Sequence, residues 1–408
     1  MGRSAITLIL ISLLILLAVR FYVYSLGNKV SDGEQIEFEA RALSQVKTTS
    51  YSQSFRLNYK GERIFVNLPL YPPVKYGDKL KISGELNRKK LDRGEIWALK
   101  ESDIQLVTEK FSLLSPIYSF RSKAVEVYRS YLPSDEASLL LGIVFGIKES
   151  FSESFYDDLR TAGVLHVIAA SGMNVSMLGA LLAGFFGTFL RRQMAILLTI
   201  FGIFAFTALA GFEASIVRAA IMGTLAFSAQ ILGRQNWAFF GLLVSGFLML
   251  FISPSLIFDI GFQLSFSATL GLIYISPLID KMFRIRKTPV LRAVSEDFNT
   301  TVSAQVATLP IILSNFGSYS ILSVLTNVLV LWTVPILMII GGITSILAFF
   351  FQGFGIFLYL ALPLLMYFKF IVGLFGKFGG QFEIVSLPWQ LSLAYYLFIL
   401  ALFAKKFK

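Results

Sequence analysis

The chain has 408 residues, of which 55% are hydrophobic and only 15% are charged, and its formal net charge is +11. A soluble domain carries about 25% charged residues, so this composition excludes an ordinary globular protein and indicates that lipid surrounds most of the chain. The sequence contains no cysteine, which excludes disulfides and thiolate metal sites. The positive charge fits either cytoplasmic anchoring by Lys and Arg or a polyanionic cargo.

The first apolar run, residues 5–26, contains a single charged residue, Arg20. Its length is typical of a membrane-spanning helix and exceeds the apolar core of a signal peptide. Arg3 precedes the run, and no small-residue cleavage motif follows it. We therefore expect residues 1–27 to form an uncleaved transmembrane anchor.

Residues 28–110 are polar and show repeated period-two alternation. Fifteen Lys and Arg stand against twelve Asp and Glu from Lys29 to Lys110, a net charge of +3. Apolar residues alternate with polar ones in 55–59, 64–68 and 80–86, and turn motifs such as Pro72-Pro73 separate these runs. About five short strands in such a segment predict a small closed β-barrel of the OB type, with a small sandwich as the alternative.

Residues 111–133 mix apolar and basic side chains, including Arg121, Lys123 and Arg129. This pattern predicts an amphipathic helix in the membrane interface, with a plain linker helix as the alternative.

Residues 134–408 are mostly apolar and are interrupted by short charged loops. Together with the anchor they predict about ten membrane spans; those after the anchor are expected near 164–190, 193–210, 215–232, 236–252, 256–278, 296–316, 320–350, 353–376 and 389–404. The segment 320–350 is long and carries Pro335, so one kinked helix and two half-spans are both open. The piece Ala137–Ile147 is too short to cross and is expected to be re-entrant.

The distribution of basic residues orients this topology. With these spans, Arg3, the Arg191-Arg192 pair, the 281–292 loop and the C-terminal tail all fall on one side, which the positive-inside rule assigns to the cytoplasm. The β-domain falls on the outer side. We expect a multi-pass protein of the cytoplasmic membrane with both termini in the cytoplasm.

Polar side chains recur inside the apolar segments, where hydrocarbon makes them costly and where they usually face a cavity, a partner or a pathway. These pathway candidates are His166, Ser171, Gly172, Asn174, Arg218, Asp259, Gln263, Ser265, Gln305 and Asn327.

Several candidates have a structural alternative. Hydrogen bonds between helices would account for the amides of Asn174, Gln305 and Asn327. Arg218 and Asp259 would be accounted for by a buried ion pair with each other.

The segment 164–190 is punctuated by glycines, and a helix broken at Ser171-Gly172 would free backbone N–H groups that receive an anion. The alternative is that Ser171 and Gly172 only permit close helix packing. His166 is the single histidine of the sequence, so no metal site or other cofactor is expected.

Four sequence blocks then resemble the ComEC family of competence proteins, in the same order. They are LLLGIVFGIKESFSESFYDDLRTAGVLHVIAASGMNVSML, EASIVRAAIMG, SPSLIFDIGFQLSFSATLGL and AQVATLPIILSNFGSYSILSVLTNVLVLWTVP. The resemblance implies a channel that carries single-stranded DNA across the bacterial cytoplasmic membrane during natural transformation. It also implies as partners a DNA receptor, a separate nuclease and a cytosolic helicase.

Two features depart from the family. Asn174 stands where many members have histidine, and the chain stops at Lys408 without the metallo-β-lactamase-like domain that ends many members. We therefore expect a competence (channel) domain over 134–408 and no enzymatic activity.

Aromatic side chains of the β-domain are candidates for stacking on DNA bases. They are Tyr51, Phe55, Tyr59 and Tyr71, and the alternative is that they fill the core of the barrel. Two rival functions remain: a transporter of a small anionic solute or ion, and a membrane-embedded hydrolase using Ser171 and His166.

Overall fold

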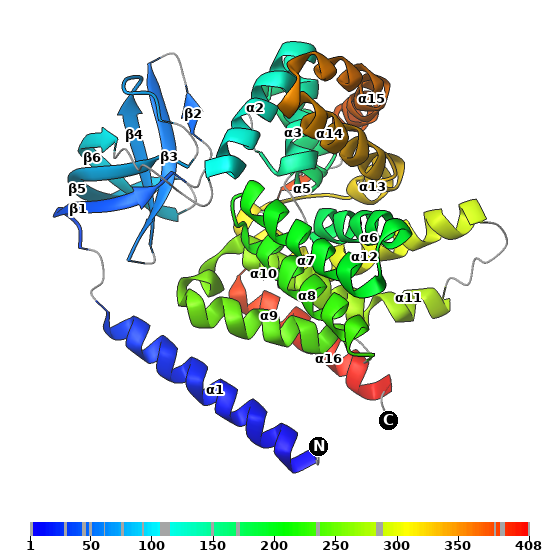
Figure 1. The fold of residues 1–408 in the computed structure, drawn as a ribbon. Helices are drawn as coiled ribbons and strands as arrows, with labels where there is room; N and C mark the ends of the chain where they lie inside the picture. The colour runs from blue at the N-terminus through cyan, green and yellow to red at the C-terminus, as the bar shows by residue number, and fades with distance from the viewer. Residues whose placement is uncertain are drawn as a thin grey trace. The chain divides into compact units, whose positions relative to one another are not determined.

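The computed structural model of the protein describes residues 3–27, 31–42, 46–48, 51–60, 62–74, 77–91, 94–106, 115–147, 151–168, 172–233, 237–282, 289–378, 381–383 and 388–406. The chain divides into two compact units, which are treated separately. The first unit comprises residues 1–127, 147–150 and 178–258, and the second comprises residues 128–146, 151–177 and 259–408. Figure 1 shows the elements of both.

The first unit contains one β-sheet and several apolar helices. The helices are α1 (Arg3–Leu26), most of α2 (Ser115–Tyr131), most of α6 (Gly172–Phe189), α7 (Arg192–Leu209), α8 (Ala214–Ile231), α9 (Ala238–Ile252) and the 3-10 helix η1 (Pro254–Phe258). Helix α7 ends where Gly211 takes a positive φ of 80°, which glycine adopts without steric cost. Arg121 of α2 is buried and donates to the carbonyl of Leu209 at 2.8 Å, so it satisfies a free carbonyl at the end of α7.

The sheet has six strands in the order β1-β5-β6-β4-β3-β2. They are β1 (Glu34–Arg41), β2 (Lys47–Thr48), β3 (Ser52–Tyr59), β4 (Glu62–Pro69), β5 (Lys79–Leu91) and β6 (Gly94–Leu106). All pairs are antiparallel except β4 with β6. The expected closed barrel is wrong at the level of strand pairing, because β1 and β2 are the two ends of the ladder among the described residues.

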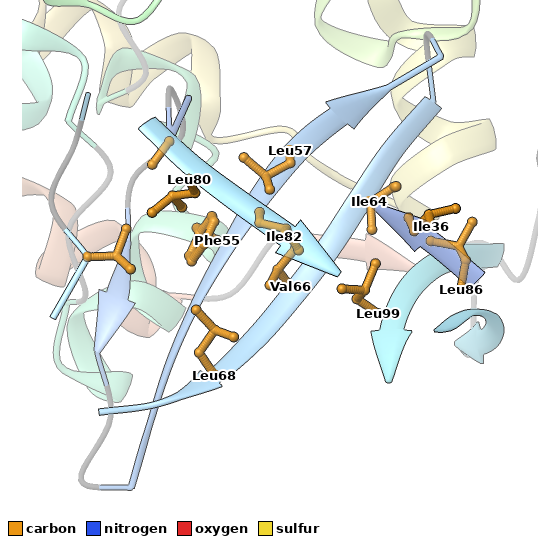
Figure 2. Close-up of a cluster of buried hydrophobic side chains, with 12 residues drawn as sticks. Ile36, Phe55, Leu57, Ile64, Val66, Leu68, Leu80, Ile82, Leu86 and Leu99 are labelled. Atoms are coloured by element: carbon orange, nitrogen blue, oxygen red, sulfur yellow. The ribbon is translucent and has the colours of Figure 1, made fainter. Parts of the chain in front are cut away.

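The predicted alternation fixes which side chains enter the core of the sheet. Figure 2 shows the buried cluster, to which all four central strands and β1 contribute. Ile64, Leu80 and Ile82 have no exposed surface, whereas Lys81, which stands between Leu80 and Ile82 on β5, is exposed. The strand β5 stays in this core on both sides of a bulge between Ser83 and Glu85, where Gly84 lies against Leu99.

The second unit is helical. Its elements are α3 (Ser134–Phe145), α4 (Glu153–Thr161), α5 (Leu165–Ile168), the first turns of α6, α10 (Ile260–Tyr274), α11 (Ser276–Met282), α12 (Pro289–Phe316), β7 (Ser318–Ser320), α13 (Ser323–Val330), α14 (Thr333–Phe350), η2 (Gln352–Leu360), α15 (Leu362–Phe378), β8 (Gln381–Glu383) and α16 (Trp389–Lys406). Helix α3 is almost wholly buried and has only 12 residues, in agreement with the expectation that this segment is too short to cross a bilayer.

Five helices in the described part of the chain are long and apolar enough to cross a membrane. They are Gly172–Phe189, Arg192–Leu209, Ala214–Ile231, Ile260–Lys281 and Thr333–Phe350. A sixth arises if η2 and α15, which are bent by 50° relative to each other, form one span. The total of about ten spans stays a prediction, and the segment 320–350 is two helices, α13 and α14, rather than one.

The core assignment of the β-domain is testable with one aromatic residue. Phe55→Ala should destabilise the sheet by about 3–5 kcal/mol, because Phe55 is 2% exposed and its loss leaves a cavity. Hydrogen exchange of the β3 and β5 amides in the intact protein measures this. Tyr51→Ala, at a position 90% exposed, should leave exchange unchanged, and equal protection in both variants would contradict the core assignment.

Candidate functional site

The segment that carries His166 and Gly172 contains two helices, α5, which ends at Ile168, and α6, which begins at Gly172. Residues 169–171 lie outside the described part of the chain, so the break at Ser171-Gly172 stays a prediction. Ser171 and the side chain of His166 lie outside the described residues, so the hydrolase hypothesis stays untested. Gly172 begins α6, and its carbonyl accepts a hydrogen bond from the Ser176 hydroxyl at 3.1 Å.

Asn174 ties the start of α6 to α3. It is 1% exposed, and its amide nitrogen donates to the carbonyl of Ile143 at 2.9 Å. Close by, Gly142 of α3 lies against Ile168 of α5, where a Cβ would come within 2.4 Å of the isoleucine side chain. Asn174 had two interpretations, a pathway residue and an interhelical hydrogen bond, and this contact favours the second. Gly142 is required for the close packing of α3 on α5.

Three candidates, Asp259, Gln263 and Ser265, lie at or near the start of α10. Asp259 precedes the helix, and its carboxylate accepts from the backbone N–H of Phe262 at 2.8 Å, so one of its oxygens caps the helix. Gln263 and Ser265 follow as half-buried residues. Further along, Gly271 lets α10 lie directly on Ser303 of α12.

Helix α12 contains Pro310, which has no N–H for the carbonyl four residues earlier, that of Val306. The hydroxyl of Tyr395 on α16 donates to this carbonyl at 2.8 Å. The next carbonyl, that of Ala307, accepts from Tyr396 at 2.9 Å and also from Ser267 of α10. Side chains from two other helices thus satisfy the carbonyls around the proline.

Gln305 stands at the centre of a second group of hydrogen bonds. Its amide nitrogen donates to Ser323 Oγ at 2.7 Å, and its amide oxygen accepts from the hydroxyl of Tyr319 at 2.6 Å. Ser323 in turn donates to the carbonyl of Ser320 at 2.7 Å. We call these bonds and those around Pro310 the α12 network: Ser267, Gln305, Tyr319, Ser323, Tyr395 and Tyr396.

Two residues of the four blocks that resemble the competence family, Gly163 and Asn327, lie beside the α12 network. Gly163 has a positive φ of 74°, and a Cβ there would come within 2.5 Å of the Ser323 side chain. Asn327 lies one helical turn after Ser323 on α13 and is 2% exposed. Two of the predicted candidates, Gln305 and Asn327, therefore lie on neighbouring helices, α12 and α13.

Arg218 belongs to the first unit. It lies in the second turn of α8 and is 8% exposed, so a charged group is largely withdrawn from solvent there. Asp259 belongs to the second unit, and the ion pair between Arg218 and Asp259 stays a prediction.

An ionic cluster in the second unit escaped the sequence prediction. Lys369 of α15 lies 2.9 Å from the carboxylate of Asp135 and 3.2 Å from that of Glu136. Burial alone would raise the pKa of Asp135, but hydrogen bonds from Ser152 and from Lys369 outweigh it and lower that pKa. A single lysine in an apolar stretch is the same signal that identified Arg218, and it should have identified Lys369.

The aromatic candidates of the β-domain divide into two kinds. Phe55 is buried, and Tyr59 packs on the core beside Phe38 with ring centroids 4.5 Å apart, so these two fill the core. Tyr51 is 90% exposed and Tyr71 is 82% exposed. The expectation that Phe55 is available to a ligand is wrong, and its alternative is confirmed.

A buried glutamine holds the loop that carries Tyr71. Gln53 is 3% exposed and donates to the carbonyls of Pro69 and Pro72 at 2.9 and 2.6 Å. Its amide oxygen accepts from the N–H of Val74 at 2.9 Å. Both polar ends of the side chain are thus used to fix residues 69–74.

In the part of the chain that the structure describes, no three His, Asp or Glu side chains are grouped so that they could hold a metal ion.

The bonds around Pro310 are testable by a double-mutant cycle. Tyr395→Phe should cost about 0.6–2 kcal/mol, because it leaves the Val306 carbonyl without its donor. In a Pro310→Ala background the restored N–H takes that carbonyl, so the cost should approach zero. Unfolding of the detergent-solubilised protein measures both.

Tyr367→Phe is the matched control, since its hydroxyl donates to the Leu329 carbonyl at 3.1 Å, away from Pro310. Its cost should be the same in both backgrounds. An equal cost of Tyr395→Phe in the two backgrounds would refute the role assigned to the proline.

Comparisons with known proteins agree with the resemblance read from the four blocks. The profile of a family described as "Competence protein" matches residues 143–408, more than half of the chain. A curated relative, ComE operon protein 3 of Bacillus subtilis (strain 168), is 26% identical over 255 residues, which cover 62% of this chain and 31% of that protein. The chain thus aligns with about a third of that relative's length, and no solved structure matches. The protein belongs to the ComEC family of competence proteins.

Proposed function

We propose that this protein carries single-stranded DNA across the bacterial cytoplasmic membrane during natural transformation, as a channel rather than an enzyme. The observation that carries the proposal is the α12 network, a set of polar side chains among apolar helices within the segment that matches the competence family. Polar groups in that setting usually line a pathway or hold helices around one.

The β-domain would be the part that first binds the strand, on the outer face of the membrane. Its pairings support an OB-type fold: β3 with β4, β5 with β6 and β1 with β5 are antiparallel, and β4 with β6 is parallel. The ladder ends at β1 and at β2, which do not pair with each other among the described residues, and this is compatible with the partly open barrel of that fold.

Tyr51 and Tyr71 would form the base-stacking surface of this domain. Ser52 pairs with Pro69, so the two tyrosines flank the same end of the β3–β4 pair. Both rings are largely exposed, and Gln53 fixes the loop that carries Tyr71. A preformed pair of exposed rings can stack on successive bases without sequence preference.

The membrane part would then supply neutral polar walls. Gln263 and Ser265 of α10, with Gln305 of α12 and Asn327 of α13, are amide and hydroxyl side chains, whose neutral polarity would let a polyanion pass without trapping it. The positive-inside rule places both termini in the cytoplasm. The DNA receptor, nuclease and helicase would act as separate partners.

Removal of the exposed rings should weaken DNA binding. Tyr51→Ala and Tyr71→Ala should each cost about 1–3 kcal/mol of binding free energy toward a poly-dT oligonucleotide, because a stacked base is lost. Binding should also weaken steeply with salt. Fluorescence anisotropy with the intact protein in nanodiscs measures both effects.

Tyr156→Ala removes an exposed tyrosine of α4 and serves as the matched control, with binding expected as in the wild type. Wild-type affinity of the Tyr51→Ala, Tyr71→Ala double variant, or a flat salt response, would rule out this surface.

Uptake of labelled DNA by competent cells tests the membrane part. Arg218→Ala and Gln263→Ala should each lower uptake several-fold, whereas Gln230→Ala, on the exposed end of α8, should not. Uptake that is unchanged in both test variants would remove these residues from the pathway. A lost flux of a small anion with normal DNA uptake would favour the rival solute transporter.

A further inference from the structure

A cavity in the first unit lies where α1 meets the end of α9 and the start of η1. Its volume is about 450 Å³, and the residues that line it are Arg20, Tyr24, Lys60, Ile252, Ser253, Pro254 and Ser255. The Nε of Arg20 donates to the carbonyl of Phe251 at 3.0 Å, which anchors the guanidinium at the carboxyl end of α9.

The depth of Arg20 in the membrane follows from helix geometry. Arg20 lies 17 residues after Arg3, which begins α1, and a helix rises about 1.5 Å per residue, so the two are about 26 Å apart. The hydrocarbon core of a bilayer is about 30 Å thick. Arg20 therefore lies near one boundary of the core when Arg3 lies near the other, and Tyr24 lies one turn further, where tyrosines are enriched.

The cavity is lined by cations and hydroxyls. Arg20 and Lys60 supply the positive charge, and Lys60 is also paired with Glu34 at 3.2 Å, which leaves one net positive charge from these three groups. Ser253 and Ser255 add hydroxyls 3.2 Å apart. This chemistry recognises a phosphodiester.

The surface near the cavity is apolar. Val23 and Leu26 on α1 are exposed, as are Ile252 at the end of α9 and Phe258 at the end of η1. Acyl chains cover such side chains, whereas a nucleic acid does not. The combination of a cationic cavity, an apolar surround and a position at the membrane boundary favours a lipid over a DNA phosphate.

We propose that this cavity binds the headgroup phosphate of an anionic phospholipid, with Arg20 and Lys60 as the binding cations. The bound lipid would join α1, the α9–η1 junction and the turn between β3 and β4, three segments of the first unit. This assignment is independent of DNA translocation and holds whether or not the protein carries DNA.

Photo-crosslinking in nanodiscs tests the site with a photoactivatable phosphatidylglycerol as the probe. Labelled peptides should map to residues 20–26 and 251–258 of the wild-type protein. Arg20→Ala and Lys60→Ala should each lower this labelling at least several-fold, and Arg20→Lys should retain more of it than Arg20→Ala. Size-exclusion chromatography verifies that each variant is folded, because Lys60→Ala also removes the ion pair with Glu34.

Arg192→Ala is the matched control, because Arg192 likewise donates to a helix carbonyl, that of Gln230, at 3.1 Å but does not line the cavity. Its labelling at residues 20–26 and 251–258 should equal that of the wild type. Excess phosphatidylglycerol should displace the probe better than phosphatidylcholine or a poly-dT oligonucleotide. Equal labelling in Arg20→Ala, Lys60→Ala and the wild type, or displacement by the oligonucleotide alone, would overturn the proposal.

Discussion

A polar group among apolar helices has no water to bond, so its partner must come from the protein itself. The second unit meets this constraint most visibly at Pro310, whose missing N–H frees the carbonyl of Val306 on α12. The hydroxyl of Tyr395 on α16 donates to this carbonyl, and the hydroxyls of Tyr396 and Ser267 donate to the next one, that of Ala307. Three helices are thereby held together by one backbone defect, and Gln305 extends the same network to α13.

The sequence predicts local structure well wherever one period decides it. The alternation in β3, β4 and β5 identified Ile64, Leu80 and Ile82 as core residues, because strand side chains change faces at every step. The order of the strands and the open ends at β1 and β2 did not follow from it, since pairing joins residues far apart in the chain. Hydropathy likewise indicated an apolar segment over 320–350 but not its division into α13 and α14.

The candidate site shows the same division. The cost of polar groups in hydrocarbon singled out Asn174 and Gln305, and both are held by hydrogen bonds in the interior. Their partners could not be predicted, because Ile143 and Ser323 come from other helices. The same rule does not identify Tyr395, because a tyrosine is common in apolar helices. Its role follows only from the Val306 carbonyl that its hydroxyl satisfies.

The central claim is that a DNA strand passes along the polar side chains of the second unit. Site-specific photo-crosslinking of a strand stalled during uptake tests it most directly, with the crosslinker placed at Gln263, at Gln305 or at Leu270, an exposed apolar position of α10. The account predicts crosslinks to the strand from Gln263 and Gln305 and none from Leu270. Crosslinks from Leu270 that equal or exceed those from the two glutamines would contradict it.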